Sequence, residues 1–240
     1  AMPKSNAILQ VRNLTKEYQI RSSKFMEKPR ILHALNGVSL EIEQGETLGV
    51  IGESGCGKST LGKCIIQLQR ATSGQVLYQG KDLCKLGNDE MKPVRKNLQM
   101  VFQDPYSSLD PRFTTLRLLE EPMLIHGMEP SAQKRKEIVL QTLQEVGLDV
   151  QHMHRFPHEF SGGQRQRISV ARALVLQPQI IVCDEPVSAL DVSVQAQVLN
   201  LLSSLQEQRN LTYIFISHDL SVIKHISDRV AIMYLGTVVE

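Results

Sequence analysis

The feature that most constrains this chain is a glycine-rich stretch, Gly52 to Ser59, which fits the pattern G-x-x-x-x-G-K-[ST] without a mismatch. The sequence predicts an apolar strand before it, Thr47 to Ile51, and a helix after it, Lys58 to Ile66. In that context the glycines bring backbone N–H groups round an anion, and the helix N-terminus adds unpaired donors and partial positive charge. A glycine-rich turn would match by accident on the order of once in a hundred chains. We therefore predict a nucleotide site.

Within this loop, Lys58 is expected to reach the outer phosphates of the nucleotide and the Ser59 hydroxyl to hold Mg²⁺. The residues expected to surround the phosphates are Gly52, Glu53, Ser54, Gly55, Cys56, Gly57, Lys58, Ser59 and Thr60.

Size and charge narrow the classes of protein that the chain can belong to. Its 240 residues suffice for one large domain with a real core, or for two small ones. Its hydrophobic content of 42% and charged content of 22% are those of an ordinary globular protein. A formal charge of +2 suggests no nucleic-acid partner. No apolar run approaches the roughly 18 residues of a membrane span, and we expect no secretion signal.

The four cysteines, Cys56, Cys64, Cys84 and Cys183, form no C-x-x-C pair. We therefore expect reduced thiols rather than a disulfide framework or a zinc site.

Strands and helices alternate along the chain, which predicts an α/β core. The region from about 104 to 175 is mostly helical and too long for a connection, so we expect an inserted helical subdomain within a single domain, 1–240. The catalytic core would then comprise about 1–103 and 176–240. Arg21 to Arg30 is polar and basic and is expected to form an exposed loop. Other predicted strands are Ile8–Val11, Val38–Ile42, Gln75–Gln79, Leu98–Phe102, Leu211–Ile216 and Val230–Tyr234.

Two carboxylates, Asp184 and Glu185, follow the apolar strand Ile180 to Cys183. At the C-terminal edge of a parallel sheet they would face a bound nucleotide. Asp184 suits the Mg²⁺ shell, and Glu185 could polarise an attacking water. Solvated acids after a strand are the alternative, which the upstream phosphate loop disfavours.

Ser161-Gly162-Gly163-Gln164 precedes a predicted helix over Gly162 to Leu176 and offers a hydroxyl and backbone donors, which predicts a second anion site. A serine-capped helix would explain Ser161 but not two successive glycines. His218 follows a buried strand, where an imidazole can reach a γ-phosphate.

The run Phe160 to Gln164 resembles the signature motif of ATP-binding cassette (ABC) ATPases, which usually begins with Leu. Nearly the whole chain follows that family's pattern. Gln103 is similar to the Q-loop glutamine that senses the γ-phosphate, Ser188 to Asp191 resembles the D-loop, and His218 resembles the switch histidine. Tyr18 resembles the aromatic residue that stacks on adenine.

The resemblance implies ATP and Mg²⁺ as cofactors, with Gln103 joining Ser59 and Asp184 as Mg²⁺ ligands. It also implies a head-to-tail dimer of ATPase subunits in which Ser161–Gln164 of one subunit caps the ATP held by the other. Glu185, His218 and Lys58 are then the catalytic residues. A second, non-identical ATPase subunit is the usual partner, although a homodimer stays possible.

Within the family, Val101 to Pro111 is similar to the second ATPase subunit of bacterial dipeptide and oligopeptide importers. Nickel and metallophore importers share that subfamily, so they remain an alternative. The resemblance implies a peripheral place at the cytoplasmic face of the inner membrane, with membrane permease subunits as partners and an extracytoplasmic binding protein acting indirectly. Such chains normally continue past the residue matching Glu240, so we expect a truncated chain or a shorter member.

Other classes fit the sequence less well. A ribosome-associated ABC protein would carry two cassettes, and a related DNA-repair ATPase would interrupt the cassette with a coiled coil or zinc modules. A non-enzymatic nucleotide-binding module would be expected to lack Glu185 or His218.

Overall fold

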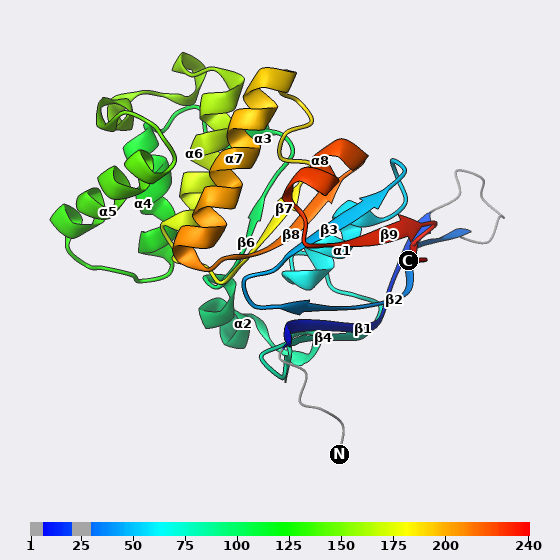
Figure 1. The fold of residues 1–240 in the computed structure, drawn as a ribbon. Helices are drawn as coiled ribbons and strands as arrows, with labels where there is room; N and C mark the ends of the chain where they lie inside the picture. The colour runs from blue at the N-terminus through cyan, green and yellow to red at the C-terminus, as the bar shows by residue number, and fades with distance from the viewer. Residues whose placement is uncertain (1–6, 21–29) are drawn as a thin grey trace. The chain divides into compact units, whose positions relative to one another are not determined.

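A computed structural model of the chain describes residues 7–20 and 30–240 (Figure 1). The chain divides into two compact units. Unit 1 comprises 1–88 and 214–240, and unit 2 comprises 89–213. The boundaries expected for a helical subdomain, about 104 to 175, differ from this division and stay a prediction.

The antiparallel sheet of unit 1 has the strand order β2-β1-β4-β5. Its long hairpin is made by β1 (Ala7–Ile20) and β2 (Arg30–Glu43), and β4 (Ser73–Tyr78) and β5 (Lys81–Asp82) complete it. Both hairpin strands are much longer than predicted, because cross-strand pairing continues as far as Ile20 and Arg30. Of the expected loop Arg21 to Arg30, residues 21–29 lie outside the described residues, whereas Arg30 is the first residue of β2 rather than part of a loop.

Unit 1 also contains strands of the second, six-stranded sheet, and these carry the glycine-rich loop. In it, β3 (Thr47–Gly52) runs parallel to β9 (Arg229–Tyr234), and β10 (Thr237–Val238) pairs with β9 in the antiparallel sense. The helices of this unit are α1 (Lys58–Ile65) and α8 (Leu220–Ile226). Helix α8 packs closely on β3, since a Cβ on Gly49 would lie 2.8 Å from the Ile223 side chain. Strand β8 (Thr212–Ser217) begins in unit 2 and ends in unit 1.

Unit 2 contains a parallel strand pair and most of the helices. Strand β6 (Leu98–Val101) pairs with β7 (Ile180–Asp184), with Leu98 opposite Ile180. Every residue of β7 is buried, as its apolar sequence up to Cys183 predicts for a strand of a parallel pair. The helices are α2 (Asn88–Arg95), α3 (Pro105–Ser108), α4 (Thr115–Ile125), α5 (Ala132–Glu145), α6 (Gly162–Leu174) and α7 (Val192–Arg209).

Local sequence determines where these helices start and stop. The side chains of Thr114, Ser131, Ser161 and Asp191 each accept a hydrogen bond from a backbone N–H in the first helical turn that follows. After α5, Gly147 adopts φ +71°, the left-handed conformation that ends helices. Helix α6 ends at Leu174, two residues before the predicted end.

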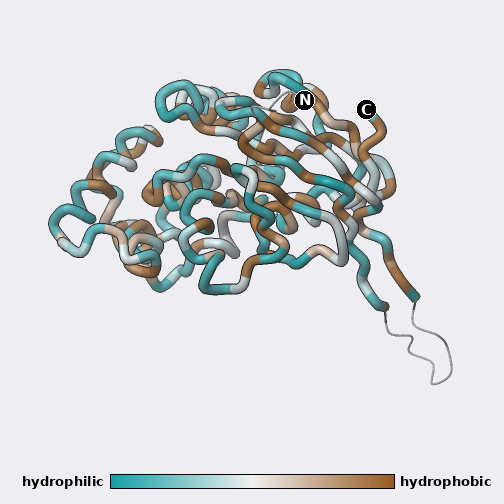
Figure 2. The backbone as a smooth tube through the Cα atoms, turned by 90° about the horizontal axis from the view of Figure 1, so that it is seen from below, coloured by the Kyte–Doolittle hydropathy of each residue, from teal (hydrophilic) through white to brown (hydrophobic). Residues whose placement is uncertain are grey.

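The predicted α/β organisation is found, with an antiparallel sheet in unit 1 and a helical region in unit 2. Figure 2 shows hydrophobic and hydrophilic residues alternating along many segments of the backbone. Along β9 burial alternates instead, although four successive residues are apolar: Ala231 and Met233 are buried whereas Val230, Ile232 and Tyr234 are exposed. Within the described residues, no helix is long and apolar enough to cross a membrane.

Candidate functional site

The glycine-rich loop between β3 and α1 has a backbone that requires glycine. Gly55 and Gly57 adopt φ +80° and +106°. A Cβ on Gly57 would lie 2.3 Å from the Ala34 carbonyl oxygen, and one on Gly52 would lie 2.4 Å from that of Met233. Gly57 is the N-cap of α1, and no side chain of the described residues caps this helix start. The backbone donors of its first turn are therefore not consumed by a side-chain cap.

Lys58 is the first residue of α1, and its side chain folds back over the loop. The residue is only 6% exposed, and its Nζ donates to the carbonyl oxygens of Gly52 at 2.7 Å and Glu53 at 2.8 Å. Among the described residues no carboxylate forms an ion pair with this ammonium. Its charge is held beside the loop backbone by neutral acceptors, which leaves it available to an anion.

Tyr18 lies near the end of β1, in the same unit as the loop. Its hydroxyl donates to Oε1 of Gln69 at 2.8 Å, and the Lys16 ammonium lies 5.0 Å from the centroid of its ring. The same ammonium donates to the Arg70 carbonyl oxygen at 2.8 Å. The segment that follows α1 therefore fixes both the ring and the cation beside it, so Tyr18 is a positioned aromatic residue rather than a loose surface one.

His218 follows the buried strand β8 directly and is exposed, as its predicted role requires. The next residue, Asp219, caps α8 by accepting from the Ser221 N–H. Hydrogen bonds from Ser221 hold the pKa of Asp219 below its ordinary value, and His218 lowers it further. The turn that carries the imidazole is thus fixed by a helix cap.

In unit 2, the strand β7 ends at Asp184, which is 6% exposed. Glu185 follows in the left-handed region with φ +52°. A residue with a Cβ has a steric cost in this conformation, and such residues gather at functional sites. The Glu185 carbonyl oxygen accepts from the Ser188 N–H at 3.3 Å and from the Ser188 hydroxyl at 3.1 Å, which holds the turn.

The four cysteines are free thiols. Cys183, next to Asp184, is completely buried, and burial together with the Asp184 carboxylate raises the pKa of its thiol far above the ordinary range. Burial also raises the pKa of Cys64 to about 11. These two thiols stay neutral at physiological pH and contribute to packing.

The start of α6 is capped by side chains of its own first turn. The Ser161 hydroxyl accepts from the Gln164 N–H at 3.3 Å, and the Ser161 N–H donates to Oε1 of Gln164 at 3.1 Å. This reciprocal pair is a capping box. A Cβ on Gly163 would lie 2.4 Å from Cγ1 of Val194 in α7, whereas one on Gly162 would meet Leu190 at an ordinary 3.4 Å. The absence of a Cβ at Gly163 therefore allows α6 to approach α7. The expectation that a serine cap explains neither glycine is wrong for Gly163, which has this packing role.

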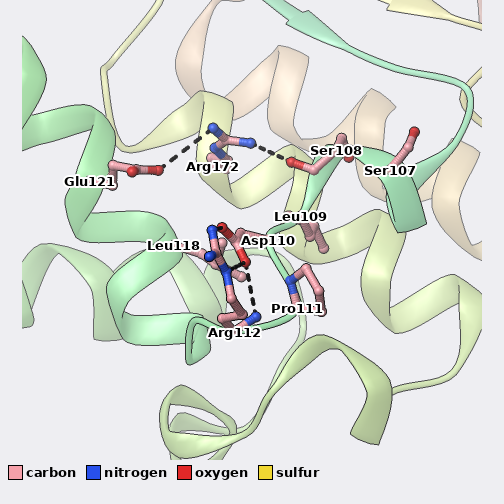
Figure 3. Close-up of a pocket in the computed structure, with 9 residues that line it drawn as sticks. All are labelled: Ser107, Ser108, Leu109, Asp110, Pro111, Arg112, Leu118, Glu121 and Arg172. Atoms are coloured by element: carbon pink, nitrogen blue, oxygen red, sulfur yellow. Dashed lines mark hydrogen bonds and ion pairs between the residues drawn. The ribbon is translucent and has the colours of Figure 1, made fainter.

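Gln103 lies two residues after β6 and is exposed. Beyond it, the structure forms a hollow of about 550 Å³ that sequence reasoning missed (Figure 3). Arg172 crosses this hollow, donating to the Ser108 carbonyl oxygen at 2.6 Å and pairing with Glu121 at 3.9 Å. Arg172 stands near the end of α6 in no recognisable motif, so only the fold could find it. The lining residues are Ser107, Ser108, Leu109, Asp110, Pro111, Arg112, Leu118, Glu121 and Arg172.

The predicted site residues divide between the units. Unit 1 holds Tyr18, the loop Gly52–Thr60 and His218, whereas unit 2 holds Gln103, Ser161–Gln164 and the acidic pair Asp184 and Glu185. In each unit these residues lie at strand ends or helix starts, where backbone donors and side chains can meet a ligand.

Curated relatives resemble the chain over almost its full length. The oligopeptide transport ATP-binding protein AppF of Bacillus subtilis is 54% identical over 97% of this chain and 71% of its own. The oligopeptide transport ATP-binding protein OppF of Escherichia coli is 51% identical over 97% of this chain and 70% of its own. The dipeptide transport ATP-binding protein DppF of the same species is 51% identical over 97% and 69%.

Solved structures share the fold. A dimeric structure of MJ0796, described as a bacterial ABC transporter cassette, superposes with a TM-score of 0.83 at 30% identity and 97% coverage of both chains. A post-hydrolysis dimer of the same cassette, bound to ADP and Pi, superposes with a TM-score of 0.82 at 31% identity and the same coverage. The family model described as ABC transporter matches residues 35–188. The phosphate loop, the acidic strand end and these matches together show that the chain belongs to the ABC transporter family and is an ABC-type ATPase domain.

Proposed function

We propose that this chain is the ATP-hydrolysing subunit that energises a bacterial importer of dipeptides or oligopeptides. The observation that carries the proposal is the identity of 54% and 51% to proteins named for oligopeptide and dipeptide transport. The similarity covers 97% of the chain in each case, so it includes the helical region as well as the nucleotide-binding loop. A nickel or metallophore importer of the same subfamily remains the alternative, and transport assays with each cargo separate the two.

In the proposed site, the backbone of Gly52–Thr60 binds the phosphates of ATP and the Lys58 ammonium contacts the outer ones. Lys58 must exchange its bonds to the Gly52 and Glu53 carbonyl oxygens for phosphate oxygens, a change from neutral to charged acceptors that favours binding. Adenine stacks on Tyr18, on the ring face opposite Lys16.

The residues proposed for Mg²⁺ supply a hydroxyl at Ser59, an amide oxygen at Gln103 and a carboxylate at Asp184. All are oxygen donors, which is the set that this hard cation prefers, so the chemistry of the residues fits. Asp184 lies at the end of a fully buried strand, where a carboxylate is favoured by a nearby cation. When bound, Mg²⁺ would neutralise charge on the phosphates.

Hydrolysis in this proposal depends on Glu185 and His218. Glu185 accepts a proton from the attacking water, and its carboxylate is aimed by the left-handed turn at φ +52°. The His218 imidazole donates to the γ-phosphate from the turn after β8.

The proposed assembly is a head-to-tail pair of ATPase subunits, by analogy with the dimeric cassettes that this chain is similar to. Ser161, Gly162, Gly163 and Gln164 cap the ATP held by the other subunit, which is a homologous second ATPase or a second copy of this chain. Closure and reopening of the pair are passed to membrane permease subunits, and an extracytoplasmic binding protein delivers the cargo. The chain is then a peripheral protein at the cytoplasmic face of the inner membrane.

Glu185→Gln tests the ATP-bridged dimer. The substitution keeps the size of the side chain but removes its charge and basicity, so we expect ATP turnover to be lost and the variant to accumulate as a dimer with ATP and Mg²⁺. Light scattering with saturating ATP measures this shift. Glu207→Gln on the exposed side of α7 removes the same charge and should remain monomeric. A Glu185→Gln protein that stays monomeric, alone and with the partner ATPase subunit, would refute the proposal.

A further inference from the structure

The segment between the proposed catalytic Glu185 and α7 is held by a side chain that no motif includes. Gln195, in the first turn of α7, folds back over the loop that precedes its own helix. Its Nε2 donates to the carbonyl oxygens of Val187 and Leu190, both at 3.0 Å. Both hydrogens of the amide are therefore used, and both acceptors belong to the same short loop.

The loop that Gln195 holds is built of interlocking turns. The Leu190 N–H donates to the Val187 carbonyl oxygen at 3.1 Å, and the Ser188 N–H and hydroxyl both donate to that of Glu185. Val187 is buried at 3% exposure, so its carbonyl oxygen accepts two bonds in a position sheltered from water. The conformation of the loop therefore depends on hydrogen bonds that other groups of the protein donate to its carbonyl oxygens.

The strained backbone at Glu185 explains why the loop needs hydrogen bonds in addition to those of its own turns. Glu185 adopts φ +52°, a conformation that a residue with a Cβ keeps only when its surroundings impose it. At the other end Asp191 caps α7 by accepting from the Val194 N–H at 3.0 Å and the Ser193 hydroxyl at 2.8 Å. The two hydrogen bonds of Gln195 hold the residues that lie between Glu185 and Asp191.

We propose that Gln195 is a positioning residue for ATP hydrolysis, which fixes the segment Glu185–Asp191 through its two hydrogen bonds to Val187 and Leu190. In this role Gln195 acts through the loop that carries Glu185. This inference rests on the proposed function of Glu185. The chemical requirement is an NH₂ group at this point, because an oxygen there would face two carbonyl oxygens.

Two substitutions of similar size test the requirement. Gln195→Glu places a carboxylate against the two carbonyl oxygens, and Gln195→Met places a methyl group there. We expect kcat for ATP hydrolysis to fall at least about tenfold in the first variant and about threefold in the second, because small displacements of a catalytic group are costly. KM for ATP should stay within about twofold, because Lys58 and its loop are unchanged. Turnover is measured at protein concentrations where activity per subunit no longer rises.

A general loss of stability would not produce the following two results. Hydrogen exchange at the Ser188 and Leu190 amides should accelerate in both variants, while the rest of α7 exchanges as in the unmodified chain. The activity of Gln195→Glu relative to the unmodified chain should rise as the pH falls, because a protonated carboxyl can donate one hydrogen bond. Gln208→Glu, at the exposed end of the same helix, makes the same charge change and should leave kcat unaffected.

Unchanged kcat in both Gln195 variants would overturn the inference, as would a fall in kcat without faster exchange of the loop amides. A rise in KM at constant kcat would also overturn it. Should Gln195→Glu fail to fold, Gln195→Met decides by the same measurements. Glu185→Gln is assayed in parallel. If that variant keeps turnover, the proposed function fails, whereas loss of turnover there with normal Gln195 variants rejects the positioning role alone.

Discussion

Two helices of this chain begin in glycine-rich turns, α1 at Gly57 and α6 at Ser161, and they differ in how the backbone donors of the first turn are satisfied. Gly57 adopts φ +106° and offers no side chain to its helix. Ser161 has an extended backbone and forms a capping box with Gln164. The α1 start thus has no side-chain cap, whereas at the α6 start two of the backbone donors are satisfied by side chains of the chain itself.

The glycines of the two turns also have different causes. Gly57 is required because a Cβ would meet the Ala34 carbonyl oxygen at 2.3 Å, in a backbone conformation that disfavours other residues. Gly163 has a helical backbone, and its Cβ would meet only the Val194 side chain at 2.4 Å. Glycine is therefore required by the conformation of a tight loop in one place and by the close packing of two helices in the other.

The largest effect on ATP turnover is expected from a substitution at the start of α1. Lys58→Ala should lower ATP turnover at least a hundredfold while the protein stays folded, since two or three charge-assisted contacts of about 1.5–3 kcal/mol each are lost. Steady-state hydrolysis and thermal melting provide the measurements. Lys63→Ala removes an equal charge from the last turn of α1 and should retain turnover. Near-normal turnover in a folded Lys58→Ala protein would show that this loop is not the phosphate site.

The second prediction separates binding of the base from binding at the helix start. Tyr18→Ala should weaken ATP binding by roughly 1–3 kcal/mol, because the stacking surface is lost. Tyr18→Phe keeps the ring and loses only the bond to Gln69, so its affinity should stay close to that of the unmodified chain. Equilibrium titration with ATP measures both. Equal dissociation constants for the alanine variant and the unmodified chain would place the adenine elsewhere.

The third prediction tests the packing role of Gly163. Gly163→Ala should destabilise the fold by about 1–3 kcal/mol, the usual cost of overpacking, although alanine ordinarily favours a helix. Adding Val194→Ala should recover most of that loss, because the clashing methyl group is gone. Gly162→Ala, with an ordinary 3.4 Å contact, should be neutral or slightly stabilising. Denaturant unfolding that ranks Gly162→Ala as the more harmful change would contradict the packing role.

The smallest effect concerns the capping box. Ser161→Ala should cost about 1 kcal/mol of stability, the usual loss for an N-cap serine. Ser161→Asp retains a capping oxygen, so thermal melting should show nearly full stability. Its negative charge opposes a γ-phosphate, however, so in the Glu185→Gln background it should prevent the ATP-dependent dimer. Dimer formation by that double variant would show that the α6 start is a structural cap and no second anion site.

The sequence by itself predicted features that involve residues close together in the chain. The strand, loop and helix around Gly52–Ser59 were placed to within one residue, because apolar runs, glycine and a following amphipathic pattern are local properties. The buried strand ahead of Asp184 and the stop at Gly147 were found for the same reason. Family membership followed from such motifs in their order and was confirmed by the relatives.

Only the tertiary structure decided features that join residues distant in sequence. The hairpin strands extend beyond their apolar residues because each supplies hydrogen bonds to the other as far as Ile20 and Arg30. The need for glycine at position 163 arises from Val194 across a helix crossing, 31 positions further on in the chain. Arg172 and Gln195 stand in helices with nothing in their local pattern to distinguish them from surface residues. The fold gives them their roles, because it brings the Ser108 carbonyl oxygen within reach of Arg172. In the same way it brings the Val187 and Leu190 carbonyl oxygens within reach of Gln195.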